Sequence, residues 1–374
     1  TPAAGPVSSM DLIRGIGANP DAVVIPEDDE MGISLPPTES GLDQETCPNG
    51  EVLKLLKRSR QGLISATAHN LGIILQHDPR FAGKLCWSEM LQDPVFVADI
   101  DPMMPYVPVL PLRDHKQGDR FGARHAALLR AVLDAPIASG GYGVSFQKSD
   151  FDSAISNTSH FHPVHPIRDK LASFVHDGTQ RIDTLFIDYL GASDDAYHRT
   201  VSRLFCLGAV ARVFEPGCKF DFLPVVEGRQ GLRKSTFVRT LSMGWATELQ
   251  SGDLGKPEKL VEKLCGAWIA EVPELSAVSN TSIESMKALI TATDDKTRLA
   301  YKEYAELYPR QSVFFGTVDH SEYLKDENGN RRFWPVKATV ASIDIERLRG
   351  EVEQIWAEAV VEYRKLRESC GDDP

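Results

Sequence analysis

The stretch VVEGRQGLRKSTFVRTL, residues 225–241, constrains the fold of this 374-residue chain more than any other. A short apolar run ends in a glycine-rich turn, followed by Lys234, Ser235 and Thr236 and then by apolar residues at helical spacing. Such a unit can bind phosphate, because backbone N–H groups and a helix N-terminus converge on the oxygens, the lysine adds charge and the hydroxyl binds magnesium. In the pattern G-x-x-x-x-G-K-[ST], Arg233 replaces the second glycine. A plain strand-to-helix connection is therefore the alternative interpretation.

Two further apolar runs along the chain end in polar side chains. AWIAEVPEL carries Glu271 and Glu274, and QSVFFGTVD carries Thr317 and Asp319. Buried strands separated by helical or loop sequence predict an α/β fold with a parallel sheet, which binds its ligands at the carboxyl ends of the strands. A nucleotide hydrolase needs carboxylates there, to hold magnesium and to orient the attacking water. Solvated strand ends are the alternative.

An arginine pair follows the third run. In DENGNRRFWPV, Arg331 and Arg332 precede Phe333, Trp334 and Pro335. Free arginines here could stabilise the charge that develops in phosphoryl transfer, in their own subunit or across an interface. The alternative is an arginine pair covered by core aromatics.

Composition divides the chain into regions. The net charge is −12, but residues 1–50 hold nine acidic residues and one basic residue, which leaves −4 for the rest. With seven prolines, that segment cannot bury enough apolar surface to fold, so we expect an acidic flexible arm or linker. Residues 51–215 show helical spacing and predict a mainly helical region. Residues 216–374 contain the three apolar runs, and we expect them to form a P-loop ATPase core. This region ends with the amphipathic helix DIERLRGEVEQIWAEAVVEYRKLRE.

Targeting signals are missing from the sequence. No run reaches the eighteen or so apolar residues of a membrane span, and TPAAGPVSSMDL does not resemble a signal peptide. The six cysteines form no C-x-x-C pair, which argues against a zinc ribbon or a disulfide framework. We expect a cytoplasmic protein without a membrane partner.

Two clusters of polar residues have competing interpretations. In the segment between the second and third runs, Lys296, Arg298 and Lys302 alternate with tyrosines, a pattern suited to nucleic acid, although interspersed acidic residues equally favour a solvated face. His160, His162 and His165 in SHFHPVHPI could bind a metal, but the prolines between them favour a structural turn.

The strings HPVHPIRDKLASFVHDGTQRIDTLFIDYLGA, AVARVFEPGCKFDFLPVVEGRQGLRKSTFVRTL, LCGAWIAEVPELSA, YPRQSVFFGTVDHSEYLKDENGNRRFWPV and IWAEAVVEY together resemble the virulence-associated protein E family, over about residues 60–365. That family looks like the superfamily 3 helicases of phages, plasmids and other mobile elements. The resemblance implies an AAA+ type P-loop ATPase that uses ATP and Mg²⁺ and forms rings, usually hexamers, on single-stranded DNA in a bacterial or phage-infected cell. A primase domain often precedes such helicases and would explain the Thr1 start.

The resemblance assigns roles to matching positions. Arg331 and Arg332 match the family's arginines, and Arg310 is the arginine before the sensor strand. Glu271 and Glu274 match its acidic motif, while Thr317 and Asp319 fall in its sensor. The nucleotide loop comprises Gly228, Arg229, Gln230, Gly231, Leu232, Arg233, Lys234, Ser235 and Thr236, with Ser235 and Glu271 as metal ligands.

Two positions depart from the family pattern. Arg233 stands in place of glycine and Asp319 in place of asparagine. An aspartate near a γ-phosphate adds like charge, so ATP affinity could fall. At position 233 we expect ordinary helical torsions, because Lys234, Ser235 and Thr236 are all retained; a positive φ would strain the loop by roughly 1–3 kcal/mol. The resulting hypothesis is a DNA motor, and the alternative is a nucleotide-binding module for assembly or DNA loading that hydrolyses weakly.

Overall fold

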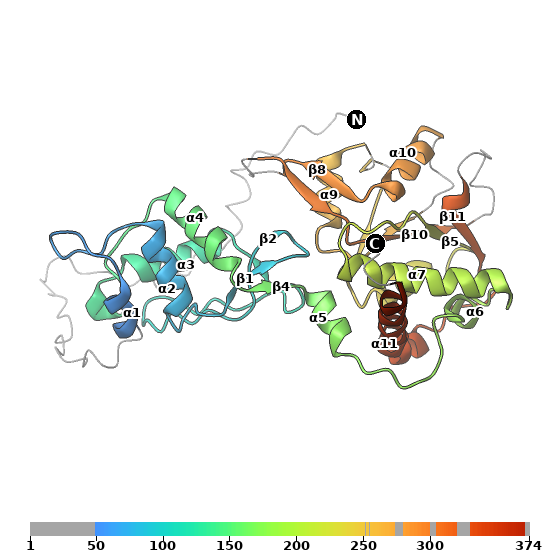
Figure 1. Cartoon of the computed structure of the whole chain (residues 1–374), viewed down its shortest axis with the longest axis horizontal. Coiled ribbons are helices and arrows are strands. Elements are labelled where there is room, and N and C mark those ends of the chain that lie inside the picture. The colour runs from blue at the N-terminus through green and yellow to red at the C-terminus, as the bar shows by residue number, and fades with distance from the viewer. Residues whose placement is uncertain are drawn as a thin grey trace, which may run out of the picture. The chain divides into compact units, whose positions relative to one another are not determined.

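In this computed structural model, the structure describes residues 49–250, 252–253, 255–273, 280–299, 304–319 and 330–370 (Figure 1). The predicted arm at residues 1–50 therefore lies almost wholly outside the described residues. Among the residues described, no helix is both long and apolar enough to cross a bilayer. The boundaries at residues 50 and 215 stay predictions.

A parallel sheet forms the centre of the C-terminal part, which confirms the predicted α/β class. Its strands lie in the order β11-β5-β10-β7-β6, and every neighbouring pair is parallel. The strands are β5 (Leu223–Glu227), β6 (Ala246–Glu248), β7 (Ile269–Val272), β10 (Val313–Val318) and β11 (Phe333–Lys337). The three apolar runs of the sequence thus become β5, β7 and β10.

Helices cover both faces of this sheet (Figure 1). On one face, Phe315 packs in a core with residues of α7 (Ala196–Phe214), α8 (Lys234–Leu241) and α11 (Ile345–Cys370). On the other face, Phe314 packs with α9 (Pro257–Leu264) and α10 (Asn280–Thr291). Successive residues of a strand point to opposite faces, so a sheet covered on both sides needs continuous apolar strands. The unbroken apolar runs in the sequence follow from this burial.

Two strands of the sheet were not predicted. The sequence of β6 is short and only partly buried, and β11 contains Pro335. Both lie at the edges of the sheet. An edge strand needs only one hydrogen-bonded neighbour and tolerates proline, so its sequence need not show a buried apolar run.

The segment between β7 and β10 also differs from the prediction of helix or loop. After α10, β8 (Asp294–Thr297) and β9 (Glu306–Pro309) pair as an antiparallel hairpin. Lys296 and Arg298 are exposed, the former on β8 and the latter just after it. Lys302 lies outside the described residues.

The N-terminal part of the described chain contains a second core, formed by residues between 52 and 155, and a small sheet ordered β3-β2-β1-β4. The strands are β1 (Leu85–Ser88), β2 (Asp93–Phe96), β3 (Asp119–Arg120) and β4 (Pro163–Val164). The helices are α1 (Gly50–Leu55), α2 (Ala68–His77), α3 (Ala123–Asp134), η1 (Ile137–Ser139), α4 (Lys148–Ser159), α5 (Pro166–Ser173) and α6 (Leu185–Leu190). In this core the fully buried Arg80 pairs with Asp78 at 2.5 Å, and Tyr142 donates a hydrogen bond to the same carboxylate. The helices α5 and α6 pack instead in the core of the parallel sheet.

Candidate functional site

The glycine-rich loop lies at the carboxyl end of β5, where the strand order reverses. From β5 the chain continues through α8 to β6 at one edge of the sheet, whereas after β10 it reaches β11 at the other edge. Neighbouring parallel strands whose connections leave in opposite directions open a crevice at their carboxyl ends, and ligands of open α/β sheets bind there. The loop and the end of β10 face each other across this crevice.

A cavity of about 330 Å³ occupies this place. Its lining comprises residues 230–236 of the loop and of the start of α8, Pro273 after β7, and Thr317, Val318 and Asp319 at the end of β10. The volume falls in the range of small-molecule sites, about 300–1,000 Å³. Three strand ends that are far apart in the sequence therefore contribute to one cavity.

Loop residues 228–232 differ in what they contribute. Gly228 is tightly packed, because a Cβ atom there would lie 2.5 Å from Cδ1 of Leu232. Leu232 is buried and anchors the loop, whereas Gly231 has a φ of +87° with open space around its Cα. Arg229 turns outward and donates to the carbonyl of Ala341 at 2.6 Å. The exposed backbone near Gln230 and Gly231 is thus open to a ligand.

The expectation of ordinary helical torsions at Arg233 is wrong. Its φ of 68° and ψ of 33° place it in the left-handed region, at the N-cap of α8. Outside glycine this conformation costs about 1–2 kcal/mol, because Cβ approaches the carbonyl oxygen. No side chain caps the helix, so the first N–H groups of α8 remain available to an anion. The loop keeps the glycine backbone at position 233 although the residue is arginine.

We expect Arg233→Gly to raise the free energy of unfolding by about 0.5–1 kcal/mol, because relief of strain outweighs the extra freedom of glycine in the unfolded chain. Urea titration followed by circular dichroism measures it. Gln92→Gly is the matched control. Gln92 also has a positive φ, of 51°, but lies away from the loop, so this variant measures the relief of backbone strain outside the candidate site. A destabilised Arg233→Gly protein would contradict the assignment of strain.

Lys234 is held by the loop and by the end of β10. Its Nζ donates to the carbonyls of Gly228 and Arg229 and forms an ion pair of 2.7 Å with Asp319. The lysine side chain is 10% exposed and that of Asp319 is 41% exposed. The charge that a phosphate would require is therefore already engaged by a carboxylate 85 residues away in the sequence.

Glu271, on β7, is hydrogen-bonded both to α8 and to the end of β10. It is buried on β7, and its Oε1 accepts hydrogen bonds from Ser235 Oγ at 2.7 Å and from Thr317 Oγ1 at 3.0 Å. The register explains this convergence, because Glu271 pairs with Phe315, two residues before Thr317. A carboxylate and a hydroxyl are the oxygen ligands that Mg²⁺ prefers, so Ser235 and Glu271 fit a magnesium site. Glu274 lies outside the described residues.

Arg331 and Arg332 lie away from the loop. They form η3 (Asn330–Arg332) just before β11, whose first residue Phe333 pairs with Leu223 at the start of β5. The loop follows the last residue of β5, about 13 Å further along the strand. Arg332 donates to Thr291 Oγ1 at 3.1 Å, and Arg331 is exposed. The two arginines therefore stand near the amino ends of β11 and β5, whereas the loop follows the carboxyl end of β5.

Other residues singled out in the sequence make structural contacts. Arg310 is buried and bonded to Asp295 and to the carbonyl of Leu289. His165 is buried, with its Nε2 2.7 Å from Gln311 Oε1, and burial lowers its pKa. His160 stacks on Trp87 with the ring centroids 4.0 Å apart.

Sequence reasoning missed the ion pair between Lys234 and Asp319 and the contribution of Pro273 and Val318 to the cavity. The signal for the ion pair was the aspartate at position 319 in place of asparagine, which by sequence alone was interpreted as a charge that repels a phosphate. For Pro273 and Val318 the signal was their position beside the polar strand ends.

Comparisons with known proteins place this chain. The family model of the virulence-associated protein E-like domain matches residues 171–372. Among solved structures, the A-form apo structure of the NrS-1 C-terminal region is similar at 12% identity and a TM-score of 0.38, covering 50% of this chain and 47% of that one. An apo structure of NrS-1 residues 305–718 is similar at 14% identity and a TM-score of 0.38, covering 54% of each chain. The chain thus spans about half the length of these structures, and no curated protein matches it.

Proposed function

The chain belongs to the virulence-associated protein E-like domain family, and we propose that it is an ATP- and Mg²⁺-dependent motor that acts on single-stranded DNA. In this proposal the core is a P-loop ATPase of the AAA+ type, related to the superfamily 3 helicases of replication. The main support is that Lys234, Ser235 and Thr317 line one cavity at the carboxyl ends of the parallel strands. The buried Glu271 accepts hydrogen bonds from Ser235 and Thr317 of this lining.

The proposal assigns a role to each residue of the candidate site. The N–H groups of the loop and of the start of α8 bind the phosphates, and Lys234 turns from Asp319 to the transferred phosphate. Ser235 and Glu271 hold the metal, which neutralises the charge that develops in the reaction. Thr317 and Asp319 lie where a side chain can orient the attacking water, and Glu274 is the second carboxylate of the predicted acidic motif.

The position of the arginine pair supports a ring. Arg331 and Arg332 stand near the amino ends of the strands, about 13 Å along the sheet from the loop at the carboxyl end of β5, so they do not reach the phosphates of their own subunit. An arginine supplied by a neighbouring subunit can stabilise the transition state of phosphoryl transfer. A head-to-tail interface that repeats closes into a ring, and we propose a hexamer. Arg331, which is exposed, is the better candidate for this role.

Mixing two inactive variants tests the shared site. We expect Lys234→Ala and Arg331→Ala each to lose hydrolysis, whereas an equal mixture recovers about a quarter of wild-type turnover, because about one interface in four then combines both wild-type residues. Turnover is measured after subunit exchange. A mixture as inactive as its components would contradict a site shared between subunits, and so would an active Arg331→Ala protein.

The DNA contacts of the proposal involve the β8–β9 hairpin. Lys296 and Arg298 are exposed there, and Lys302 belongs to the same segment of the sequence. Cations on a channel wall follow the phosphates of a single strand. These three residues remain proposed contacts.

ATP hydrolysis with and without single-stranded DNA is the direct test. We expect Mg²⁺-dependent turnover that rises when DNA is added, together with a mass in solution that corresponds to a ring when nucleotide is present. A protein that stays monomeric under all conditions, or that hydrolyses no ATP with DNA, would contradict the motor.

Two observations favour a second candidate, a module that binds nucleotide for assembly or DNA loading and hydrolyses it weakly. Arg233 is in a strained left-handed conformation, and Lys234 is paired with Asp319. The ion pair raises the free energy needed to bring Lys234 to a phosphate, and the strain at Arg233 lowers the stability of the loop. Tight ATP binding without turnover would favour this candidate over the motor.

Asp319→Asn tests whether the ion pair with Lys234 weakens nucleotide binding. We expect the Kd for ATP to fall roughly three- to tenfold, because Lys234 is released and a like charge is removed. Calorimetric titration with a slowly hydrolysed ATP analogue and Mg²⁺ measures the Kd. The matched control is Asp253→Asn, which removes the 2.6 Å ion pair of Lys263 away from the cavity. Unchanged or weaker binding by Asp319→Asn would show that the ion pair does not restrain Lys234.

A further inference from the structure

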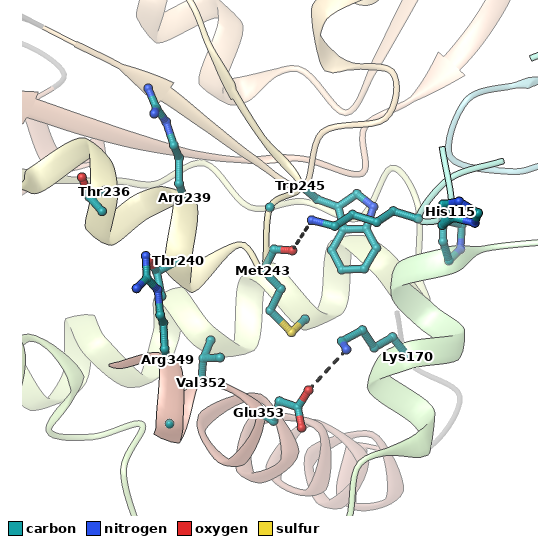
Figure 2. A pocket seen from close by; sticks show the side chains of 14 residues that line it. His115, Lys170, Thr236, Arg239, Thr240, Met243, Trp245, Arg349, Val352 and Glu353 are labelled. Atoms are coloured by element: carbon teal, nitrogen blue, oxygen red, sulfur yellow. Dashed lines mark hydrogen bonds and ion pairs between the residues drawn. The ribbon is translucent and has the colours of Figure 1, made fainter. Parts of the chain in front are cut away.

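A second cavity, of about 830 Å³, borders the helix that carries the candidate nucleotide site (Figure 2). It is lined by parts of α5, α8 and α11, by the turn after α8, and by residues 115 and 116. We call it the basic cavity, because its described lining holds one carboxylate, on Glu353, and the cations of Lys116, Lys170, Arg239 and Arg349. This excess of positive charge stands out in a chain whose net charge is −12.

Three of the four cations of the basic cavity are weakly engaged, whereas Arg349 forms an exposed ion pair with Glu346 at 2.5 Å. Within the part of the chain that the structure describes, the guanidinium of Arg239 has no hydrogen bond or ion pair. Lys116 donates to the carbonyl of Met243 at 3.2 Å and lies 5.6 Å from the ring centroid of Trp245, and no carboxylate of the described residues pairs with it. Lys170 pairs with Glu353 at 3.3 Å, and this pair is exposed. Exposed pairs contribute about 0–1 kcal/mol and exchange readily for another anion.

We propose that the basic cavity binds the sugar–phosphate backbone of single-stranded DNA. Its cations come from separate elements and lie on long, exposed side chains, which suits a chain of phosphates better than one small anion held by converging N–H groups. This site is different from the β8–β9 hairpin, since none of the described residues of that hairpin line the cavity. The inference rests on the proposed function for the choice of DNA as the polyanion.

The basic cavity is connected to the nucleotide site through α8. Thr236, in the first turn of α8, lines both cavities. Lys234 and Ser235 begin the same helix, and Arg239 and Thr240 lie one turn further on. DNA in the basic cavity therefore contacts the element that presents the phosphate-binding side chains, and this contact is a route by which DNA changes ATP turnover.

Salt-dependent DNA binding without nucleotide tests the site. A fluorescent oligothymidylate is titrated with the full chain, and log K is plotted against log salt concentration. Each cation–phosphate contact contributes about 0.7 to the slope for single strands. We expect the double variant Lys116→Gln/Arg239→Gln to reduce the slope by about 1.4, which corresponds to roughly 25-fold weaker binding at 0.1 M salt and little difference at 1 M.

The matched control is Arg364→Gln/Lys365→Gln, which removes the same two charges from an exposed part of α11 outside the cavity. We expect it to change the slope little, and thermal unfolding verifies that both variants fold. Equal effects of the two double variants would overturn the proposal, as would no oligonucleotide binding by the wild type. Displacement of the oligonucleotide by thymidine monophosphate at equal phosphate concentration would contradict the proposal that the ligand is a polymer. Displacement by polyglutamate would contradict the proposal that the ligand is a nucleic acid.

The readout separates this inference from the proposed function. A smaller slope for Lys116→Gln/Arg239→Gln supports the DNA site even when the wild type hydrolyses no ATP. Conversely, DNA-stimulated hydrolysis that persists in this variant with an unchanged slope supports the motor and overturns the DNA site.

Discussion

Lys234→Ala is expected to lower ATP hydrolysis about 100- to 1,000-fold, the typical cost of removing one preorganised donor to developing charge. Lys234 is the cation nearest the loop carbonyls, and it lines the cavity from the first position of α8. Arg229 does not substitute for it, because its guanidinium is bonded to the carbonyl of Ala341. The measurement is steady-state phosphate release with saturating Mg²⁺ and ATP.

Lys263→Ala is the matched control for this prediction. Lys263 makes the same kinds of contact, an ion pair of 2.6 Å with Asp253 and a 2.9 Å hydrogen bond to the carbonyl of Glu248, outside the cavity. We expect its turnover to stay near that of the wild type. If both lysine variants lose activity equally, the loss reflects stability rather than phosphate binding. A Lys234→Ala protein with normal turnover would sink the proposed role of the loop.

Glu271→Gln is expected to lower turnover by a similar factor, about 100-fold or more, while ATP binding is retained. Glutamine preserves the size of the side chain and still accepts hydrogen bonds from Ser235 and Thr317 through its carbonyl oxygen, so the cavity keeps its shape. What disappears is the negative charge to which the proposed function assigns the binding of the metal and the polarisation of water. Calorimetric titration with an ATP analogue and phosphate release together separate binding from turnover.

The control for Glu271→Gln is another glutamate of equal burial. Glu358 is 3% exposed, as Glu271 is, and it accepts backbone N–H bonds from Arg181 and Ile182. Glu358→Gln is expected to weaken folding and leave turnover per folded molecule unchanged. If Glu271→Gln loses nucleotide binding and turnover together, then Glu271 supports the cavity and is not the carboxylate that acts in hydrolysis.

Much of the central sheet was readable from local patterns. The runs that became β5, β7 and β10 are continuous and apolar because both faces of the sheet are covered, and the polar residues at their ends mark one edge. The long helix α11 was equally clear from its spacing. The edge strands β6 and β11 and the β8–β9 hairpin were missed, since pairing with a neighbour stabilises them more than their own apolar content does.

Within the candidate site, the residue types at positions 228–236 and at the ends of β7 and β10 followed from sequence alone, because the chemistry of a phosphate loop depends on a short contiguous segment. Three features required the folded chain: the left-handed backbone of Arg233, the ion pair between Lys234 and Asp319, and the place of Arg331 near the amino ends of the strands. Strand order and register determine which distant residues meet, and a linear pattern contains neither. The basic cavity arises in the same way, since its cations lie on four separate segments between positions 116 and 349 of the sequence.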